Sequence, residues 1–234
     1  MRSLLAVALL VAAPLLSTGA ANAANAASAG AATDAAPGAP AARACSGYVA
    51  LTYDDGPTPQ FTRPLLSALN AAGARATFFD MGSRVQQYPD LARATTAAGM
   101  WIANHSWSHP YLTRISAAEV TRELSNTQNA IRNATGQTPT LFRPPYGDTN
   151  AAVQAEARRQ GMAQVLWSVD TQDWNNASTD AIVRAATSAN AGGIVLMHDG
   201  NQRTVDAVPR IVRGLAAKNL CPGRIDSTGR VVAP

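Results

Sequence analysis

The chain contains three histidines, and two of them stand four residues apart in the segment NHSWSH, at His105 and His109. This spacing suits one metal ion if the intervening residues make a helical turn, although two independent loop histidines would give the same pattern. A carboxylate from another strand would supply a third ligand and leave one coordination position open. An open position is typical of catalytic metal sites, so the segment predicts a catalytic metal centre.

Two neighbouring acids, Asp54 and Asp55, stand where the apolar run of LTYDDGP ends. Adjacent carboxylates repel each other, so a site that holds both needs positive charge nearby. Arg143, in the segment RPPYG, also ends an apolar run and carries a permanent charge suited to holding a carboxylate. A surface arginine before a proline-rich turn would have the same sequence, and this alternative stays open.

The third histidine, His198, follows the apolar run of GIVLMHD, and Asp173 lies in the preceding segment DTQDW. A carboxylate and an imidazole at successive strand ends could form a pair in which the acid orients the ring. A satisfied core histidine is the alternative. No G-x-S-x-G segment is present, and neither cysteine stands near a histidine, so a serine or cysteine nucleophile is disfavoured.

Alternating strands and helices must position these side chains. Strands are expected at 47–53, 74–80, 100–104, 140–143, 164–170 and 193–199, and helices at 61–73, 88–99, 116–136, 149–160, 178–190 and 204–219. This alternation predicts a mostly parallel α/β sheet, either open and doubly wound or closed as a barrel. The candidate residues follow strand ends, where such folds build their sites. No glycine-rich phosphate loop follows a strand, which disfavours nucleotide binding.

The first part of the chain has the pattern of an export signal. Residues 1–23 combine Arg2, a short apolar run and Ala-x-Ala sites, which predicts a secretory signal peptide cleaved near 23–26. The run is shorter than the ~20 residues of a membrane span, so we expect a secreted protein without a membrane anchor. Residues 24–42, rich in Ala, Gly and Pro, predict a flexible lead-in, and 43–234 one catalytic domain.

Two cysteines, Cys45 and Cys221, stand at the two ends of this domain. Export to an oxidising compartment favours a disulfide between them, with two separate buried thiols as the alternative. The formal net charge is +4, but the basic residues are scattered. We therefore expect no nucleic-acid partner.

Five segments stand in order along the chain: TYDDGP, HSWSH, RPPYG, DTQDW and LMHD. Together they resemble the polysaccharide deacetylases, the carbohydrate esterases of family 4 with the NodB homology domain, over essentially all of 45–221. Within that family the chain is most similar to actinobacterial acetylxylan esterase catalytic domains. Tyr53 departs from the pattern, which commonly has phenylalanine there. The resemblance implies a distorted (β/α) barrel of about seven strands in a single domain.

The resemblance also implies a role for each candidate residue. It implies the metal ligands Asp55, His105 and His109, the base Asp54 held by Arg143, the acid His198 oriented by Asp173, an oxyanion-binding N–H at Tyr146, and an acetyl pocket formed by Trp174 and Leu196.

These implications predict a secreted, metal-dependent carbohydrate deacetylase that acts as a monomer on a polysaccharide or oligosaccharide. The O-acetyl groups of acetylxylan are the first expected substrate, and the N-acetyl groups of chitin oligosaccharides or peptidoglycan are alternatives. A non-catalytic glycan-binding protein with the same fold is an alternative of another class. Two imidazoles and a carboxylate suit Zn²⁺, with Co²⁺ or Ni²⁺ also compatible.

Overall fold

The computed structural model describes residues 45–234, and the predicted signal peptide (1–23) and lead-in (24–42) lie outside the described residues. The strands are β1 (Gly47–Gly56), β2 (Thr77–Asp80), β3 (Trp101–Asn104), β4 (Leu141–Phe142), β5 (Ala163–Gln164), β6 (Val169–Asp170), β7 (Ile194–His198), β8 (Leu220–Ile225) and β9 (Val231–Val232). The α-helices are α1 (Thr62–Ala71), α2 (Gly82–Gln87), α3 (Pro89–Ala97), α4 (Ala117–Thr135), α5 (Ala151–Arg159), α6 (Thr179–Ser188) and α7 (Gln202–Ala217).

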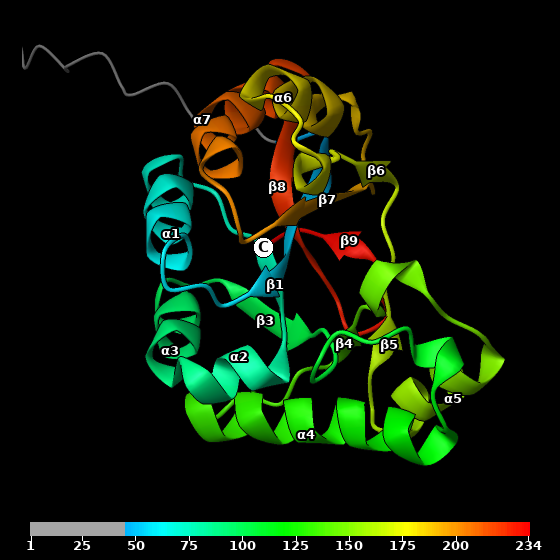
Figure 1. Cartoon of the computed structure of the whole chain (residues 1–234). Coiled ribbons are helices and arrows are strands. Elements are labelled where there is room, and N and C mark those ends of the chain that lie inside the picture. Colours follow the sequence, from blue (N-terminus) through cyan, green and yellow to red (C-terminus); the bar gives the residue numbers. More distant parts are fainter. Residues whose placement is uncertain (1–44) are drawn as a thin grey trace, which may run out of the picture. The chain divides into compact units, whose positions relative to one another are not determined.

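Seven parallel strands form a curved wall in the order β5-β4-β3-β2-β1-β7-β6, with the helices outside it (Figure 1). Among the described residues no pairing joins β5 to β6, so the barrel is open on that side. The predicted distorted barrel of about seven strands in a single domain is confirmed.

The longest strand, β1, lies in the middle of this wall, and its side chains are buried on both faces. Val49, Leu51 and Tyr53 pack with α1, α6 and α7 in the main core, whereas Ala50 packs inside the barrel with Phe79. Burial on both faces is typical of a parallel strand covered by helices. The core thus holds β1 rigidly, and its C-terminal end becomes a fixed platform.

The predicted helices are present with small shifts at their ends. At α4 the Ser116 side chain accepts a hydrogen bond from the Glu119 N–H in a capping box, and the helix ends at Gly136 with a left-handed φ of 74°. The short helix α2 was not predicted. It begins at Gly82, where a Cβ would come within 2.6 Å of Trp107 and 2.5 Å of Thr127.

The single strand predicted at 164–170 is wrong, because the segment divides into β5 and β6. Strand β5 pairs with β4, and β6 pairs with β7 on the other side of the barrel opening. Between them the carbonyls of Val165 and Leu166 accept hydrogen bonds from the Arg143 guanidinium, at 3.4 and 3.0 Å. A buried side chain therefore replaces strand pairing at this position.

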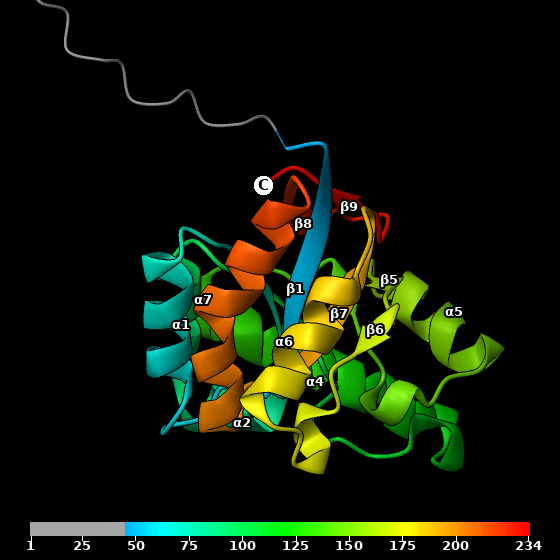
Figure 2. The ribbon, with the colours of Figure 1, turned by 90° about the horizontal axis from the view of Figure 1, so that it is seen from above.

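Strand β8 was also not predicted, since it contains Pro222 and Gly223, residues that are depleted in strands. It pairs with the first part of β1 and with β9 (Figure 2).

The Cys45–Cys221 disulfide joins the start of the described chain to β8, as predicted. Closing so long a loop contributes about 3–5 kcal/mol on the chain-entropy account. Within residues 45–234, no helix has the length and apolar character of a membrane span.

Candidate active site

The two aspartates at the end of β1 face the same cleft, although neighbours in a regular strand point to opposite faces. The register between β1 and β2 shifts between Asp54 and Gly56, and Asp55 has a left-handed φ of 68°. This bulge turns the second carboxylate toward the first. Both line a cleft of about 540 Å³ at the C-terminal edge of the barrel.

Three side chains converge beside this bulge in a geometry that fits a metal ion. Asp55 Oδ1 lies 3.4 Å from His105 Nε2 and 3.2 Å from His109 Nε2, and the three ligand atoms lie within 4.8 Å of one another. Asp55 Oδ1 is buried without a hydrogen-bond partner in the described residues. A buried carboxylate oxygen without a hydrogen bond, together with two ring nitrogens, is a suitable donor set for a divalent cation.

The two histidines are oriented by the backbone around them. His105 follows β3, and its Nδ1 donates to the Arg143 carbonyl at 2.8 Å. The lone pair of Nε2 is therefore free to bind a metal ion. His109 has a left-handed φ of 63°, as does Ser106, so the loop turns tightly enough to bring the second ring back. Its N–H donates to Ser106 Oγ at 3.1 Å.

Asp54 is held by a fully buried arginine. Nη1 of Arg143 donates to Asp54 Oδ1 at 2.7 Å and to Thr52 Oγ1 at 2.8 Å, and the guanidinium lies 4.0 Å from the centre of the Phe79 ring. The second Asp54 oxygen, Oδ2, lies 3.8 Å from His105 Nε2. One carboxylate oxygen is thus fixed, and the other faces the metal-ligand cluster.

On the opposite wall His198 is bound to Asp173. His198 Nδ1 donates to Asp173 Oδ1 at 2.7 Å, while Asp173 Oδ2 accepts from the His198 N–H at 2.8 Å and from Thr204 Oγ1 at 2.7 Å. Burial alone would lower the pKa of His198, but the hydrogen bond and charge of Asp173, with Asp54 and Asp55, raise it to about 9. The imidazole is therefore protonated at neutral pH.

Asp173→Asn is expected to lower the pKa of His198 to or below its ordinary value, because burial remains while the negative partner is lost. We expect the alkaline limb of the activity profile to move down by at least about 2.5 pH units, and activity at neutral pH to fall about 10²-fold, because the ring loses both its proton and its orienting partner. In the wild type, the stability from this pair should be complete below pH 6.5 and lost as pH rises through about 9.

The measurements are pH–rate profiles and melting temperatures between pH 6 and pH 10. Asp206→Asn, an exposed change on α7, is the matched control and should leave both profiles in place. An unmoved alkaline limb in Asp173→Asn would contradict the assignment of that limb to His198.

Aromatic side chains form the rim of the cleft. Tyr146 has a left-handed φ of 60°, and its ring stacks on Tyr111 at 4.2 Å and meets His109 edge-on at 4.4 Å. Trp174 is 60 % exposed, and its Nε1 donates to Asp170 Oδ1 at 3.3 Å. Exposed rings beside polar groups suit the binding of sugars, which present both apolar faces and hydroxyls.

All the site residues expected from the sequence therefore gather at one cleft. The lining includes Asp54, Asp55, His105, His109, Tyr146, Trp174, Leu196 and His198, and Arg143 and Asp173 lie behind it as hydrogen-bond partners. Three further lining residues, Tyr111, Trp167 and Asp170, were not expected. Tyr111 stands two residues after His109, so its position was a usable signal. Trp167 lies in the segment wrongly predicted to be one strand.

The sequence model of polysaccharide deacetylases matches residues 42–165. The chain belongs to the polysaccharide deacetylase family. A solved family 4 carbohydrate esterase from Streptomyces lividans, in complex with acetate, is 52 % identical with a TM-score of 0.80, covering 82 % of this chain and 100 % of that one. These matches confirm the resemblance to polysaccharide deacetylases.

Two curated relatives differ in their named substrates. The bifunctional xylanase/xylan deacetylase of Cellvibrio japonicus is 44 % identical over 193 residues, which are 81 % of this chain and 29 % of that protein. A chitooligosaccharide deacetylase of Rhizobium leguminosarum bv. trifolii is 39 % identical over 65 % of this chain and 71 % of that protein. The chain spans about a third of the length of several curated relatives.

This polysaccharide deacetylase carries two more carboxyl groups beside the end of β1, Asp80 and Asp199. Asp80 ends β2 and is fully buried, and neither of its oxygens forms a hydrogen bond within the described residues. A Cβ on Gly56 would come within 2.6 Å of Asp80 Oδ1 and 2.9 Å of Asp199 Oδ2. Burial, with the charges of Asp199 and Asp54, raises the pKa of Asp80 well above its usual range. Asp80 stands at the end of a strand, as the predicted site residues do, but it was not among the residues predicted from the sequence.

Asp80→Asn is expected to stabilise the protein at neutral pH, because an amide is neutral at every pH and the buried carboxyl is not. The gain should be present above the unfolded pKa of about 4 and vanish below it. We expect the melting temperature to rise by about 2–4 °C at pH 7, which corresponds to about 1 kcal/mol at this size. Melting curves at pH 4 and pH 7 test this, with exposed Asp206→Asn, which forms no ion pair among the described residues, as the control. An equal shift at both pH values would contradict it.

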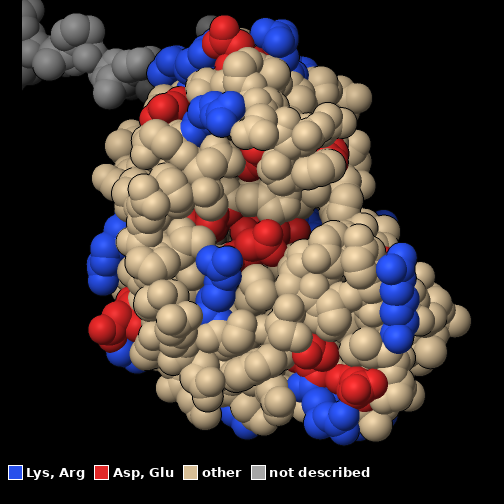
Figure 3. Space-filling view, in the orientation of Figure 1, with Lys and Arg blue, Asp and Glu red and all other residues tan. Residues whose placement is uncertain are grey.

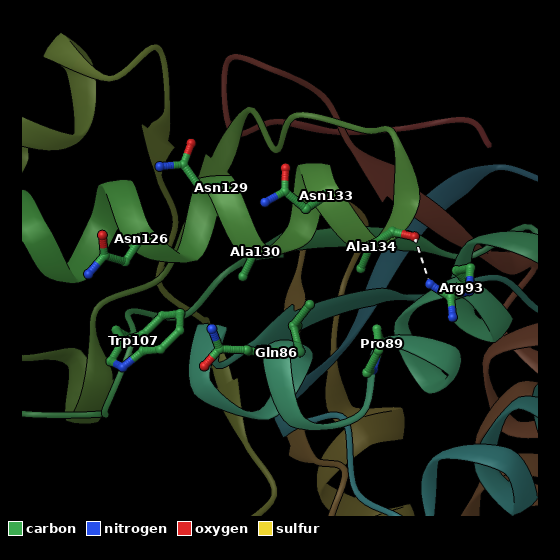
Figure 4. A pocket seen from close by; sticks show the side chains of 10 residues that line it. Gln86, Pro89, Arg93, Trp107, Asn126, Asn129, Ala130, Asn133 and Ala134 are labelled. Atoms are coloured by element: carbon green, nitrogen blue, oxygen red, sulfur yellow. Dashed lines mark hydrogen bonds between the residues drawn. The ribbon is translucent and has the colours of Figure 1, made fainter.

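A second groove of this deacetylase, of about 510 Å³, lies between α2 and α4, and no residue of the candidate active site lines it. Trp107 and Gln86 lie at one end, and Arg93 donates to the Ala134 carbonyl at the other (Figure 4). The described residues that line the groove include four amide side chains, Trp107 and Arg93, but no acid and no histidine.

Proposed function

We propose that this protein is a secreted, metal-dependent hydrolase that removes O-acetyl groups from xylan. The observation that carries the proposal is the placement of two differently held carboxylates, Asp54 and Asp55, opposite the protonated His198 in one cleft. The similarity to a xylan deacetylase and to a family 4 carbohydrate esterase supports the acetylxylan assignment.

Asp55, His105 and His109 would hold the metal. A divalent ion bound there supplies Lewis-acid chemistry, lowering the pKa of a water and polarising an acetyl carbonyl. Two imidazoles and one carboxylate favour Zn²⁺, with Co²⁺ and Ni²⁺ as alternatives. Removing metal with a chelator and restoring single ions, with activity recorded, ranks the three.

The protein's own groups provide the base, the oxyanion contact and the acetyl pocket. Asp54 accepts a proton from the attacking water through Oδ2, while Arg143 holds its other oxygen with a hydrogen bond. The backbone N–H of Tyr146 donates to the developing oxyanion, a contact typically worth ~3 kcal/mol. Leu196 and Trp174 enclose the acetyl methyl group.

The leaving group receives its proton from His198. Asp173 orients the ring and keeps it charged, so the departing sugar oxygen leaves as a hydroxyl. Acetate and a free sugar hydroxyl are the products, and the water supplies the oxygen and hydrogen that balance the reaction.

Chitin oligosaccharides are the second candidate substrate. An amide needs protonation of its leaving nitrogen more than an ester does, and His198, whose pKa is raised to about 9, can provide it. The similarity to a chitooligosaccharide deacetylase supports this alternative. Peptidoglycan is a third candidate of the same chemical type.

Acetate release from acetylated xylan, N-acetylglucosamine oligomers and peptidoglycan, measured with one enzyme preparation, tests the proposal. We expect the highest kcat/KM on acetylated xylan. A higher value on either N-acetylated substrate would overturn the xylan assignment, and no release from any of them would favour a non-catalytic glycan-binding protein.

Secretion is tested separately. Mass spectrometry of protein recovered from the culture medium should find a mature N-terminus near residues 23–26, as expected for signal peptide cleavage.

A further inference from the structure

The candidate cleft continues beyond the reacting centre into a second hollow of about 500 Å³. The two hollows share Asp55 and His198, which line both of them. A polysaccharide extends on both sides of the sugar that reacts, so both hollows lie where sugars of one chain would bind. Figure 3 shows acidic side chains in the hollowed middle of this face with a basic side chain next to them.

The lining differs on the two sides of the reacting centre. Exposed aromatic rings, including Tyr111 and Trp174, line the first hollow. The second is lined by Gln60, Phe61 and Arg84, together with the shared residues and the loop after β7. Among the described residues that line the two hollows, Arg84 on α2 is the only one with a permanent positive charge.

The guanidinium of Arg84 is available for a ligand. It forms no hydrogen bond or ion pair within residues 45–234, although its charge partly offsets the raised pKa values of the buried Asp80 and Asp199. Asp199, which also lines the hollow, is 1 % exposed, and its oxygens accept hydrogen bonds from other groups. Its Oδ1 accepts from Thr58 Oγ1 at 3.0 Å and its Oδ2 accepts from Thr62 Oγ1 at 2.5 Å. An arginine whose N–H donors are unoccupied is suited to bind a carboxylate from outside.

We propose that the Arg84 hollow binds a carboxylate-bearing sugar of the substrate chain, so that the protein selects acidic xylan that carries glucuronic acid branches. This inference rests on the proposed deacetylase function. The carboxylate would lie beside Arg84 rather than beside Asp55, because like charges repel. Gln60 supplies an amide for sugar hydroxyls, and Phe61 supplies a ring for a sugar face.

The test compares two acetylated xylooligosaccharides of equal length, one with a glucuronic acid branch and one without. We expect the wild-type protein to prefer the acidic oligosaccharide by about tenfold in kcat/KM, a factor typical of one charge-assisted hydrogen bond. Arg84→Gln should reduce this ratio to about one, and Arg84→Lys should keep part of it. The wild-type preference should also fall between 0.02 and 0.5 M NaCl, because added salt screens the charge.

Arg63→Gln, on α1 and outside both hollows, is the matched control and should leave the ratio unchanged. If Arg84→Gln unfolds, competition by a non-acetylated glucuronic acid-branched oligosaccharide against wild-type protein replaces it. The acidic competitor should then bind about tenfold more tightly than the unbranched one.

Equal rates on both oligosaccharides, or a preference that survives Arg84→Gln, would overturn the inference and leave the proposed function standing. Failure to release acetate from either oligosaccharide would overturn both. A stronger preference for muramic acid fragments with a free lactyl carboxylate would assign the hollow to peptidoglycan and overturn the xylan proposal.

Discussion

Asp54→Asn is expected to lower kcat by about 10²–10⁴-fold while the protein keeps its metal, which is the usual range for loss of a general base. Asparagine has nearly the same shape as aspartate, and its carbonyl oxygen can still accept the 2.7 Å hydrogen bond from Arg143. It cannot take a proton from water. The three metal-ligand atoms do not include Asp54, so metal content should be unaffected.

The same substitution should cost stability, because it leaves the fully buried Arg143 charge without its carboxylate partner. Breaking a buried ion pair from one side typically costs about 3–5 kcal/mol. Activity must therefore be measured well below the melting temperature of the variant.

The matched control for Asp54→Asn is the same change at the next residue. Asp55→Asn should lose metal affinity first and activity as a consequence. Metal content by elemental analysis and kcat, measured on both variants, separate the two roles. Wild-type turnover in Asp54→Asn would refute the base assignment, and metal loss from both variants would refute the division of roles between the two carboxylates.

His105→Ala is expected to abolish metal binding and to reduce activity by more than about 10³-fold. The change removes one of three ligand atoms and also the hydrogen bond that His105 Nδ1 donates to the Arg143 carbonyl. Loss of the metal removes both water activation and oxyanion stabilisation, and a single oxyanion donor alone is worth about 10²–10³-fold.

Two readouts test His105→Ala: metal per protein chain, and the rise in melting temperature when Zn²⁺ is added. A bound ligand stabilises the folded state by mass action, so the rise should occur in the wild type and be absent in the variant. Ser108→Ala is the control from the same segment, because its hydroxyl donates to Glu123 Oε1 at 2.7 Å. A stoichiometric metal content in His105→Ala would contradict the ligand assignment.

The helices were predictable because their signals are local. The Ser116 and Glu119 capping box marks the start of α4, and Gly136 marks its end. The long apolar runs of β1 and β7 were equally clear, since parallel strands buried on both faces leave little polar sequence. Where strand pairing depends on partners distant in sequence, prediction was poorer. The segment 164–170 has strand composition throughout, yet two of its carbonyls, those of Val165 and Leu166, accept hydrogen bonds from Arg143 instead of from a neighbouring strand.

The candidate site was recognisable from residue types and from their positions at strand ends. In a parallel α/β fold these ends meet at one edge, so Asp54, His105, Arg143 and His198 could be expected to lie together. What could not be predicted was how two consecutive aspartates share one cleft. That depends on the bulge at Asp55, where the residue has a left-handed φ and the register between β1 and β2 shifts.

The amino-acid sequence already contains the reactive groups of the site: three carboxylates, three imidazoles and a guanidinium, all near the ends of strands. Which of their atoms come into contact depends on the tertiary structure. It buries Arg143 so that one nitrogen holds Asp54, it leaves Asp55 Oδ1 without a hydrogen bond beside two histidines, and it directs Arg84 into the extension of the cleft. Residue types and spacing show which chemical groups are present. The partner of each group depends on hydrogen bonding and burial, which exist only in the folded chain.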